Sequence, residues 1–392
     1  MIAIQNHGSS STNAGAGIYI HVPFCKQACH YCDFHFSTNL KQKDALISAL
    51  KKELHLRKNE LGEIAIETIY FGGGTPSLLT IDELNDIFEF IYSSYTVVPS
   101  AEVTLEANPD DLSINYIIAL STTKVNRLSI GIQSFSDTDL RLMNRAHSSK
   151  EAQRCLEAAT SHFNNCSIDL IYGIPNMGDE RWRAMIQEAL KFNIPHISAY
   201  ALTVEPKTAL AHFIAQGKIQ NVDDEQAQRQ YHILVEVLGA HGFVNYEISN
   251  FGKPDYFSRN NTAYWQGRPY LGIGPSAHSY DGKRRGWNVR NNSKYIRALQ
   301  EGLIPITYEE LSDRDRYNEY VMTGLRTIWG VSLQKVRNDF GRSYRDYLVE
   351  QAEKYVEQHF LFWDNDVLLA TKKGKFLVDG IASNLFMLNL SH

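Results

Sequence analysis

Six strand-like segments, each followed by an amphipathic stretch, fill the first half of this 392-residue chain. The alternation predicts parallel strands joined by helices, because parallel neighbours need a crossover connection and a helix supplies it. The segments are apolar at successive positions, which is typical of strands buried on both faces. The sequence therefore predicts an α/β fold with a parallel sheet covered by helices. The predicted strands are residues 17–22, 68–74, 101–108, 125–132, 166–174 and 195–202.

Three cysteines lie in the loop that follows the first predicted strand. Cys25, Cys29 and Cys32 are spaced C-x3-C-x2-C, directly after the strand-ending Pro23. Thiolates bind soft metals, and an iron-sulfur cube held by three cysteines has one iron without a protein ligand. That iron is free to bind a small molecule. Because loops at the carboxyl ends of parallel barrel strands carry the chemistry of such folds, we predict a metal site here.

Zinc is the alternative metal for this loop, because a histidine can complete a tetrahedral Cys3His site. Tetrahedral sites usually space their ligands as two pairs, which this run does not do. A disulfide is disfavoured by the odd number of clustered cysteines. The spacing alone leaves both metals open. The histidines close enough in sequence to serve are His21, His30 and His35.

Glycines and polar side chains end several predicted strands. Gly72, Gly73 and Gly74 end the second strand, where they predict either a tight turn or a backbone wall with a nest of amides for a ligand. Polar residues at the ends of successive barrel strands converge on one cavity, whereas each alone fits a capping role equally well. Their repetition favours a site. The polar residues concerned are Glu106, Gln133 and Asp169.

Arg145 and His147 follow the helix after the fourth strand. The arginine predicts either a clamp for a carboxylate or an exposed charge at a helix end. Downstream, an aromatic and glycine-rich stretch contains Tyr264, Trp265 and His278. It predicts either a lining for a flat macrocycle or a loop packed over the barrel mouth.

The chain divides into three predicted parts. Residues 1–16, rich in Ser, Gly and Asn, are expected to form a mobile tail. Residues 17–285 form the core with a lid segment, and residues 284–292 read as a linker. Residues 292–392 predict an α+β domain of winged-helix type, because helices there precede a hairpin whose turn is Asp364-Asn365-Asp366.

The composition indicates a cytoplasmic protein without a transmembrane segment. No apolar run approaches the ~20 residues that a membrane-spanning helix needs, and the N-terminus lacks the basic and apolar regions of a signal peptide. In a reducing compartment the clustered thiols stay available for metal. The net charge of −5 gives no basic field for nucleic acid, so no nucleic-acid partner is expected.

The three cysteines and the GGGTP run resemble the radical S-adenosylmethionine superfamily. The runs YIHVPFC, RLSIGIQSF, DLIYGIP, YEISNF and YLGIGPSAHS are similar to the relatives of the oxygen-independent coproporphyrinogen III oxidase, over about residues 17–390. The resemblance implies a partial (β/α)6 barrel and a 4Fe-4S cluster. It also implies S-adenosylmethionine bound through its amino and carboxylate groups to the open iron, and a small electron donor such as flavodoxin or ferredoxin.

The resemblance also implies roles for individual residues. The matching residues fall into two groups. Residues of the first group match contacts of the S-adenosylmethionine that binds the cluster. Residues of the second group match positions that contact a second S-adenosylmethionine in the oxidase. The first group is Tyr19, Gly73, Glu106 and Ala201; the second is Tyr31, Gly74, Thr75, Gln133, Arg145 and Asp169.

Two departures favour the HemW branch of this family, which is regarded as haem chaperones. Phe34 stands where the oxidase has a fourth cysteine, and only 24 residues precede Cys25. This resemblance implies haem or a porphyrin as ligand and a haem-acceptor protein as partner. The alternatives are an oxidase that converts coproporphyrinogen III to protoporphyrinogen IX, and a non-catalytic, zinc-stabilised barrel. Whether the chain is an enzyme stays open; if catalytic, it is an oxidoreductase of the coproporphyrinogen type.

A third departure concerns the haem itself. HemW proteins commonly carry an H-N-x-x-Y-W motif linked to haem binding, and this chain has Asn260 at the place of the histidine. An asparagine amide is not a usual ligand of haem iron. The expected axial ligand must therefore come from elsewhere, with His278 and His147 as the candidates.

Overall fold

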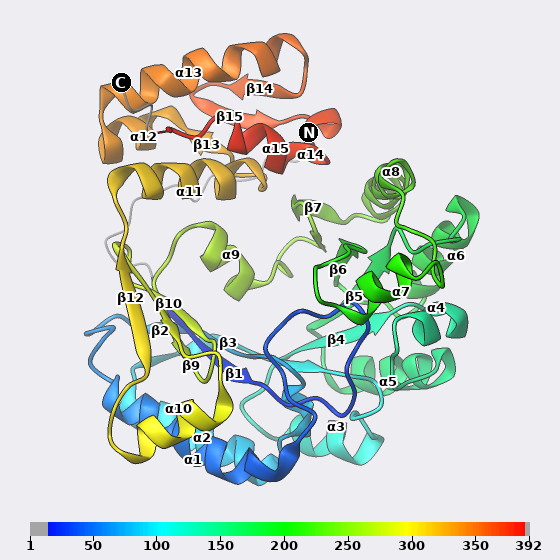
Figure 1. Ribbon diagram of the computed structural model, residues 1–392, viewed down its shortest axis with the longest axis vertical. Helices are drawn as coiled ribbons and strands as arrows, with labels where there is room; N and C mark the ends of the chain where they lie inside the picture. The colour runs from blue at the N-terminus through cyan, green and yellow to red at the C-terminus, as the bar shows by residue number, and fades with distance from the viewer. Residues whose placement is uncertain (1–14, 389–392) are drawn as a thin grey trace.

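The computed structural model describes residues 15–388 and is built on a strongly curved parallel sheet (Figure 1). Six parallel strands lie side by side in chain order, which confirms the predicted partial barrel. Most of their residues are buried, as expected for a sheet covered by helices. The strands are β1 (Ala16–Val22), β2 (Ile66–Gly73), β3 (Val97–Ala107), β4 (Arg127–Gln133), β5 (Cys166–Tyr172) and β6 (His196–Ala201).

Helices connect these strands and cover the outside of the sheet (Figure 1). Two of them begin with complete capping boxes, and the box of Thr80 and Glu83 opens α2. Three of the other six helices start at a side-chain N-cap, supplied by Ser113, Thr208 and Asp223, so the local sequence fixes where these three start. They are α1 (Lys43–Leu56), α2 (Ile81–Ser94), α3 (Ile114–Leu120), α4 (Asp137–Leu142), α5 (Ser149–His162), α6 (Asp179–Leu190), α7 (Ala209–Ala215) and α8 (Asp224–Ala240).

The sheet continues beyond the six parallel strands at both edges. Past β6 lie β8 (Asn250–Gly252) and β7 (Val244–Glu247), and past β1 lies β9 (Tyr270–Ile273), parallel to it. The antiparallel strands β10 (His278–Tyr280), β11 (Arg284–Asn288) and β12 (Ile306–Glu310) then complete a sheet of twelve described strands.

Two predictions for this region were wrong. The FVNYEISNF run forms two short strands rather than one, and the predicted linker at 284–292 is largely β11. Residues of the predicted linker form a strand because a tight turn folds β11 back on β10. In this turn the Asp281 carboxylate accepts hydrogen bonds from the amides of Lys283 and Arg284.

The predicted mobile tail lies outside the described residues up to residue 14, and Ala16 already belongs to β1. At the other end, helix α10 (Asn292–Gln300) packs on α1 through the buried Tyr295 and Leu299. Both α10 and β12 therefore belong to the barrel, although residues 292–392 were predicted to form the C-terminal domain. The separate C-terminal core begins with α11.

The C-terminal unit has its own hydrophobic core and lies over one end of the barrel (Figure 1). Its hairpin turns at Asp364-Asn365-Asp366 as predicted, with Asn365 at φ 53°. A third short strand and the helices around the hairpin give the expected winged-helix-like α+β arrangement. The elements are α11 (Asp313–Leu325), β13 (Val331–Ser332), α12 (Leu333–Phe340), α13 (Arg342–Glu357), β14 (Leu361–Asp364), β15 (Val367–Ala370), α14 (Lys372–Lys375) and α15 (Val378–Ser383).

The two units are joined by polar contacts at β7. Arg326 at the end of α11 forms an ion pair of 2.9 Å with the buried Glu247, and Lys375 donates a hydrogen bond to the Asn245 side chain. Between the units, helix α9 (Arg259–Trp265) faces α11 across the open side of the barrel (Figure 1). None of the helices in residues 15–388 is long and apolar enough to cross a membrane.

Candidate functional site

The cysteine loop leaves the carboxyl end of β1, as the sequence predicts. Cys25, Cys29 and Cys32 are all half-buried and unpaired by disulfides. The loop is held to itself by a backbone hydrogen bond of 3.1 Å from the Cys25 amide to the carbonyl of Ser37. Burial raises the pKa of the Cys25 thiol to about 11. The two remaining cysteines of the chain, 155 and 166, are buried in the core, as expected of inert thiols.

A continuous chain of hydrogen bonds joins two of these sulfur atoms. The Thr75 hydroxyl donates to the sulfur of Cys25 at 3.4 Å, and the Asn108 amide donates to the Thr75 oxygen at 3.0 Å. The Arg145 guanidinium then donates to the Asn108 carbonyl oxygen and, through its other nitrogen, to the Cys29 sulfur at 3.2 Å. The arginine also donates to the backbone carbonyl of Gly131. Arg145 is therefore no exposed helix-end charge, because it faces the cysteine loop.

The glycine run fastens β2 to the cysteine loop. The amide of Gly74 donates to the carbonyl of Val22 at 2.9 Å, and the amide of Thr75 donates to the carbonyl of Phe24 at 2.7 Å. A Cβ atom on Gly74 would lie 2.7 Å from both carbonyl oxygens. Gly73 has φ +105° and its amide donates to Glu106. The predicted amide nest is wrong for Gly73 and Gly74, because their donors have partners within the protein.

Two carboxyl groups face the barrel interior beside this loop. Glu106 accepts hydrogen bonds from the Tyr70 hydroxyl at 2.7 Å and from the Gly73 amide at 3.1 Å. Burial, together with the nearby charge of Asp169, raises the pKa of Glu106 to about 7, although the hydrogen bond from Tyr70 opposes the rise. Burial likewise raises the pKa of Asp169 to about 6. Tyr19 stacks on Tyr70 with 6.1 Å between ring centroids and completes this wall.

The other residues carried over from the family lie at the same end of the barrel. Gln133 ends β4 with φ 65° and is mostly buried, and Ala201 ends β6 half-buried. Tyr31 lies in the cysteine loop. Burial raises the pKa of its phenol, and the positive charge of Arg145 offsets only part of this rise. The Nε of Arg145 is buried and has no hydrogen-bond partner among the described residues. An unpaired buried donor on a cation fits an anionic ligand.

The residues fit an iron-sulfur cluster better than a zinc ion. In residues 15–388 no group of three His, Cys, Asp or Glu side chains is placed as a metal-ion site, the three loop cysteines included, so the choice between the two rests on the side chains around the loop. The histidines proposed for zinc each have another hydrogen-bond partner: His21 contacts the His35 carbonyl, His35 contacts Asn292, and His30 contacts the Leu142 carbonyl. By contrast, hydroxyl and guanidinium donors aimed at thiol sulfurs suit a large anionic cluster.

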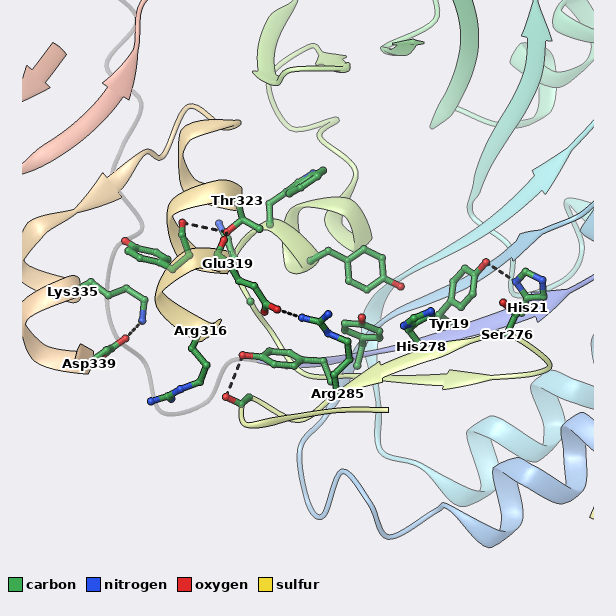
Figure 2. Close-up of a pocket in the computed structure, with 18 of the residues that line it drawn as sticks. Tyr19, His21, Ser276, His278, Arg285, Arg316, Glu319, Thr323, Lys335 and Asp339 are labelled. Atoms are coloured by element: carbon green, nitrogen blue, oxygen red, sulfur yellow. Dashed lines mark hydrogen bonds and ion pairs between the residues drawn. The ribbon is translucent and has the colours of Figure 1, made fainter. Parts of the chain in front are cut away.

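A cavity of about 740 Å³ lies between the barrel and the C-terminal unit (Figure 2). Tyr19 and His21 of β1 line it, and it reaches the cysteine loop at the exposed Phe34. Aromatic side chains from α9, β9, β10, α11 and α12 line it, and three cations face it. The aromatic residues are Tyr264, Trp265, Tyr270, Tyr280, Tyr320 and Phe340; the cations are Arg285, Arg316 and Lys335.

The cations of the cavity are paired with carboxylates of the C-terminal unit. Arg285 on β11 forms an ion pair with Glu319 on α11, which bridges the two units (Figure 2). Lys335 pairs with Asp339 at 2.5 Å. Sequence reasoning missed these residues, because Arg285 falls in the predicted linker and the C-terminal unit carries no motif that points to the cavity.

The two histidines proposed as haem ligands occupy different environments. His278 on β10 lines the cavity with much of its side chain exposed, and partial desolvation together with the charge of Arg285 lowers its pKa. His147 is 3% exposed and its Nε2 donates to the carbonyl of Ile132. His147 does not line the cavity. Asn260 is also 3% exposed and accepts a hydrogen bond from Thr68, so its side chain faces the barrel interior.

Comparisons with known proteins agree with this geometry. Residues 19–189 match the model of the radical SAM superfamily, and residues 311–377 match the HemN C-terminal domain. The chain is 33% identical to "Heme chaperone HemW" of Mycobacterium tuberculosis (strain H37Rv), with 94% of each chain covered. It is 33% identical to the protein of the same name from Bacillus subtilis (strain 168), over 92% of this chain and 96% of that one. The chain belongs to the HemW family of radical SAM proteins.

The fold is that of a solved relative. Coproporphyrinogen III oxidase (HemN) from Escherichia coli superimposes with a TM-score of 0.82 at 21% identity, covering 95% of this chain and 90% of that one. At this identity the likeness extends to the fold alone. Membership of the superfamily implies a 4Fe-4S cluster and S-adenosylmethionine, for which the cysteine loop and its neighbours are the matching site.

Proposed function

We propose that this protein is a haem chaperone that binds haem in the cavity between barrel and C-terminal unit and passes it to an acceptor protein. The observation that carries the proposal is the cavity itself, which combines aromatic walls, cations and an exposed imidazole next to the cysteine loop. Its volume of about 740 Å³ falls in the range of ~300–1,000 Å³ usual for ligand sites. The relatives named heme chaperones give the same indication.

Each part of the cavity matches one part of haem. Aromatic rings provide flat apolar contact for a macrocycle. Arg285 and Arg316 pair with Glu319 and Asp313, and on release from these ion pairs they would provide partners for the haem carboxylates. The lowered pKa of His278 favours a neutral imidazole, which is the form that ligates iron. We assign the axial position to His278 rather than His147, because the hydrogen bond of His147 to Ile132 turns it into the core.

The cysteine loop would hold the 4Fe-4S cluster through Cys25, Cys29 and Cys32. When bound, the cluster supplies electrons to S-adenosylmethionine on its open iron. Glu106 and Tyr19 line the wall beside Gly73 and suit the amino group of that ligand, and the unpaired Nε of Arg145 suits a carboxylate. Thr75 and Arg145 are among the residues that match contacts of a second S-adenosylmethionine in the oxidase, and in this structure they form hydrogen bonds with other protein groups. A small electron donor and a reducing compartment such as the cytoplasm follow from this assignment.

The proposal is tested on the anaerobically reconstituted full-length protein. Haem is titrated and followed by its absorbance, and the same sample is assayed with coproporphyrinogen III and a reductant. We expect tight haem binding and unchanged coproporphyrinogen. Conversion of coproporphyrinogen to protoporphyrinogen would make the protein an oxidase, and absence of haem binding would refute the chaperone assignment.

The axial ligand is tested with a matched pair of variants. His278→Ala should remove the imidazole from the cavity and change the absorbance spectrum of bound ferric haem. His147→Ala serves as the control, because His147 lies outside the cavity. An unchanged haem spectrum in His278→Ala would show that another residue ligates the iron.

A further inference from the structure

We propose that Asn108 is a positioning residue that holds Thr75 and Arg145 against the sulfur atoms of Cys25 and Cys29 and thereby raises the reduction potential of the cluster. The proposal rests on the cluster site and does not depend on haem binding. It starts from the hydrogen-bond chain in which Asn108 is the central member and the two thiols are the ends.

Asn108 is itself firmly placed. It follows β3 directly, its amide donates to the Ser77 hydroxyl at 3.4 Å, and its carbonyl accepts from the amide of Asp111 at 3.1 Å. Its side chain uses both ends of the carboxamide, because the oxygen accepts from Arg145 while the nitrogen donates to Thr75. An aspartate can only accept at this position, and a leucine can do neither.

The amide sets the direction of the hydroxyl proton of Thr75. A hydroxyl has one proton and two lone pairs. Since the Asn108 amide donates to the Thr75 oxygen, the hydroxyl proton is directed to its other neighbour, the Cys25 sulfur at 3.4 Å. On the other side, the oxygen of Asn108 and the carbonyl of Gly131 both accept from one terminal nitrogen of the guanidinium, and the other terminal nitrogen donates to the Cys29 sulfur.

These contacts act on the charge of the cluster. One-electron reduction adds a negative charge that spreads over the ligand sulfurs. Donors and a cation at those sulfurs stabilise the reduced form more than the oxidised form, which raises the reduction potential. The guanidinium is half-buried, so water screens its charge only in part. A purely structural role, in which the chain of bonds merely links the loops after β2, β3 and β4, would change stability without changing the potential.

The test uses three variants of the full-length, anaerobically reconstituted protein without S-adenosylmethionine or haem. Asn108→Leu removes both hydrogen bonds, and Asn108→Asp adds a charge and draws the Thr75 proton away from Cys25. Thr75→Val removes only the hydroxyl. The control Tyr116→Phe removes a hydroxyl that binds the same loop at the Leu79 carbonyl, away from the sulfurs. The midpoint potential is measured by redox titration with dithionite and mediators, monitored by electron paramagnetic resonance, alongside iron and sulfide content.

We expect the potential to fall in the order wild type, Asn108→Leu, Asn108→Asp. For Asn108→Asp we expect about a tenfold change in the one-electron equilibrium, which corresponds to about 59 mV. Thr75→Val should also lower the potential, and Tyr116→Phe should not. Unchanged potentials in cluster-loaded variants would overturn the proposal. If the Asn108 variants fail to hold a cluster, Thr75→Val decides: a lowered potential supports the proposal, and a wild-type potential refutes it.

Discussion

The contact between the glycine run and the cysteine loop leads to the sharpest stability prediction. In Gly74→Ala the new Cβ would lie 2.7 Å from the carbonyl oxygens of Val22 and Phe24 and 2.8 Å from the amide nitrogen of Phe24. All three atoms belong to the backbone, so no side-chain rotation can relieve the clash. The β2 loop must move away from the cysteine loop, and the two hydrogen bonds from Gly74 and Thr75 must lengthen.

The magnitude follows from these contacts. Overpacking at a tight site typically costs about 1–3 kcal/mol. Each weakened backbone hydrogen bond adds about 1 kcal/mol, although movement of the loop relieves part of the clash. We therefore expect Gly74→Ala to lower the free energy of unfolding by about 2–4 kcal/mol. The displaced loop should also reduce the iron content after reconstitution, because it carries Thr75 away from Cys25.

The matched control is Gly239→Ala. Gly239 lies in α8 with nothing within 4 Å of the new Cβ. Alanine is the better helix former, so this variant should be unchanged or more stable by up to about 1 kcal/mol. The same substitution thus has opposite signs at the two positions.

Urea unfolding of the cluster-free variants measures the difference, and hydrogen exchange of the amides of Gly74 and Thr75 locates it. Both amides should exchange faster in Gly74→Ala than in the wild type. Gly74→Ala with wild-type stability and full cluster content would refute the view that close backbone approach requires this glycine.

Three further predictions concern charge and ligands. In the cavity, Glu319→Gln should free Arg285 for a ligand carboxylate and tighten haem binding about 2- to 5-fold, because a partly exposed ion pair contributes up to about 1 kcal/mol. Arg285→Gln should weaken haem binding. Equal affinities of the two variants in a haem titration would contradict this role of Arg285. The raised pKa of Glu106, about 7 against an ordinary 4.5, means that the folded state binds the extra proton, so its stability should fall as the pH rises from about 4.5 to 7. Because Glu106 keeps some solvent contact, we expect a fall of about 1–2 kcal/mol, which denaturant unfolding at pH 5 and pH 8 should reveal in the wild type and not in Glu106→Gln. Cys29→Ala should leave two thiolates, too few for the cube, so cluster absorbance should be lost after reconstitution, whereas a normal spectrum would show that the ligands are misassigned.

Much of the barrel could be predicted because its signals are local. Buried strands with a helix between each pair produce a repeating pattern in the sequence, and Thr80 with Glu83 marks a helix start within four residues. The errors came where pairing joins short segments, as in the two strands of the FVNYEISNF run and in β11. There a few residues adopt strand conformation because a neighbouring strand offers hydrogen bonds, which local propensity does not encode.

By itself the sequence determined the three-cysteine loop, its place after β1, the adjoining glycines and the family, because covalent spacing and strand ends fix all of these. Only the tertiary structure decided which polar groups meet. It brought Asn108 between Thr75 and Arg145, put His278 at the cavity while burying His147, and joined Arg285 to Glu319. Such encounters depend on the order of strands in the sheet and on the docking of the C-terminal unit. The free energy that fixes them is spread over two hydrophobic cores, so no short stretch of sequence carries it.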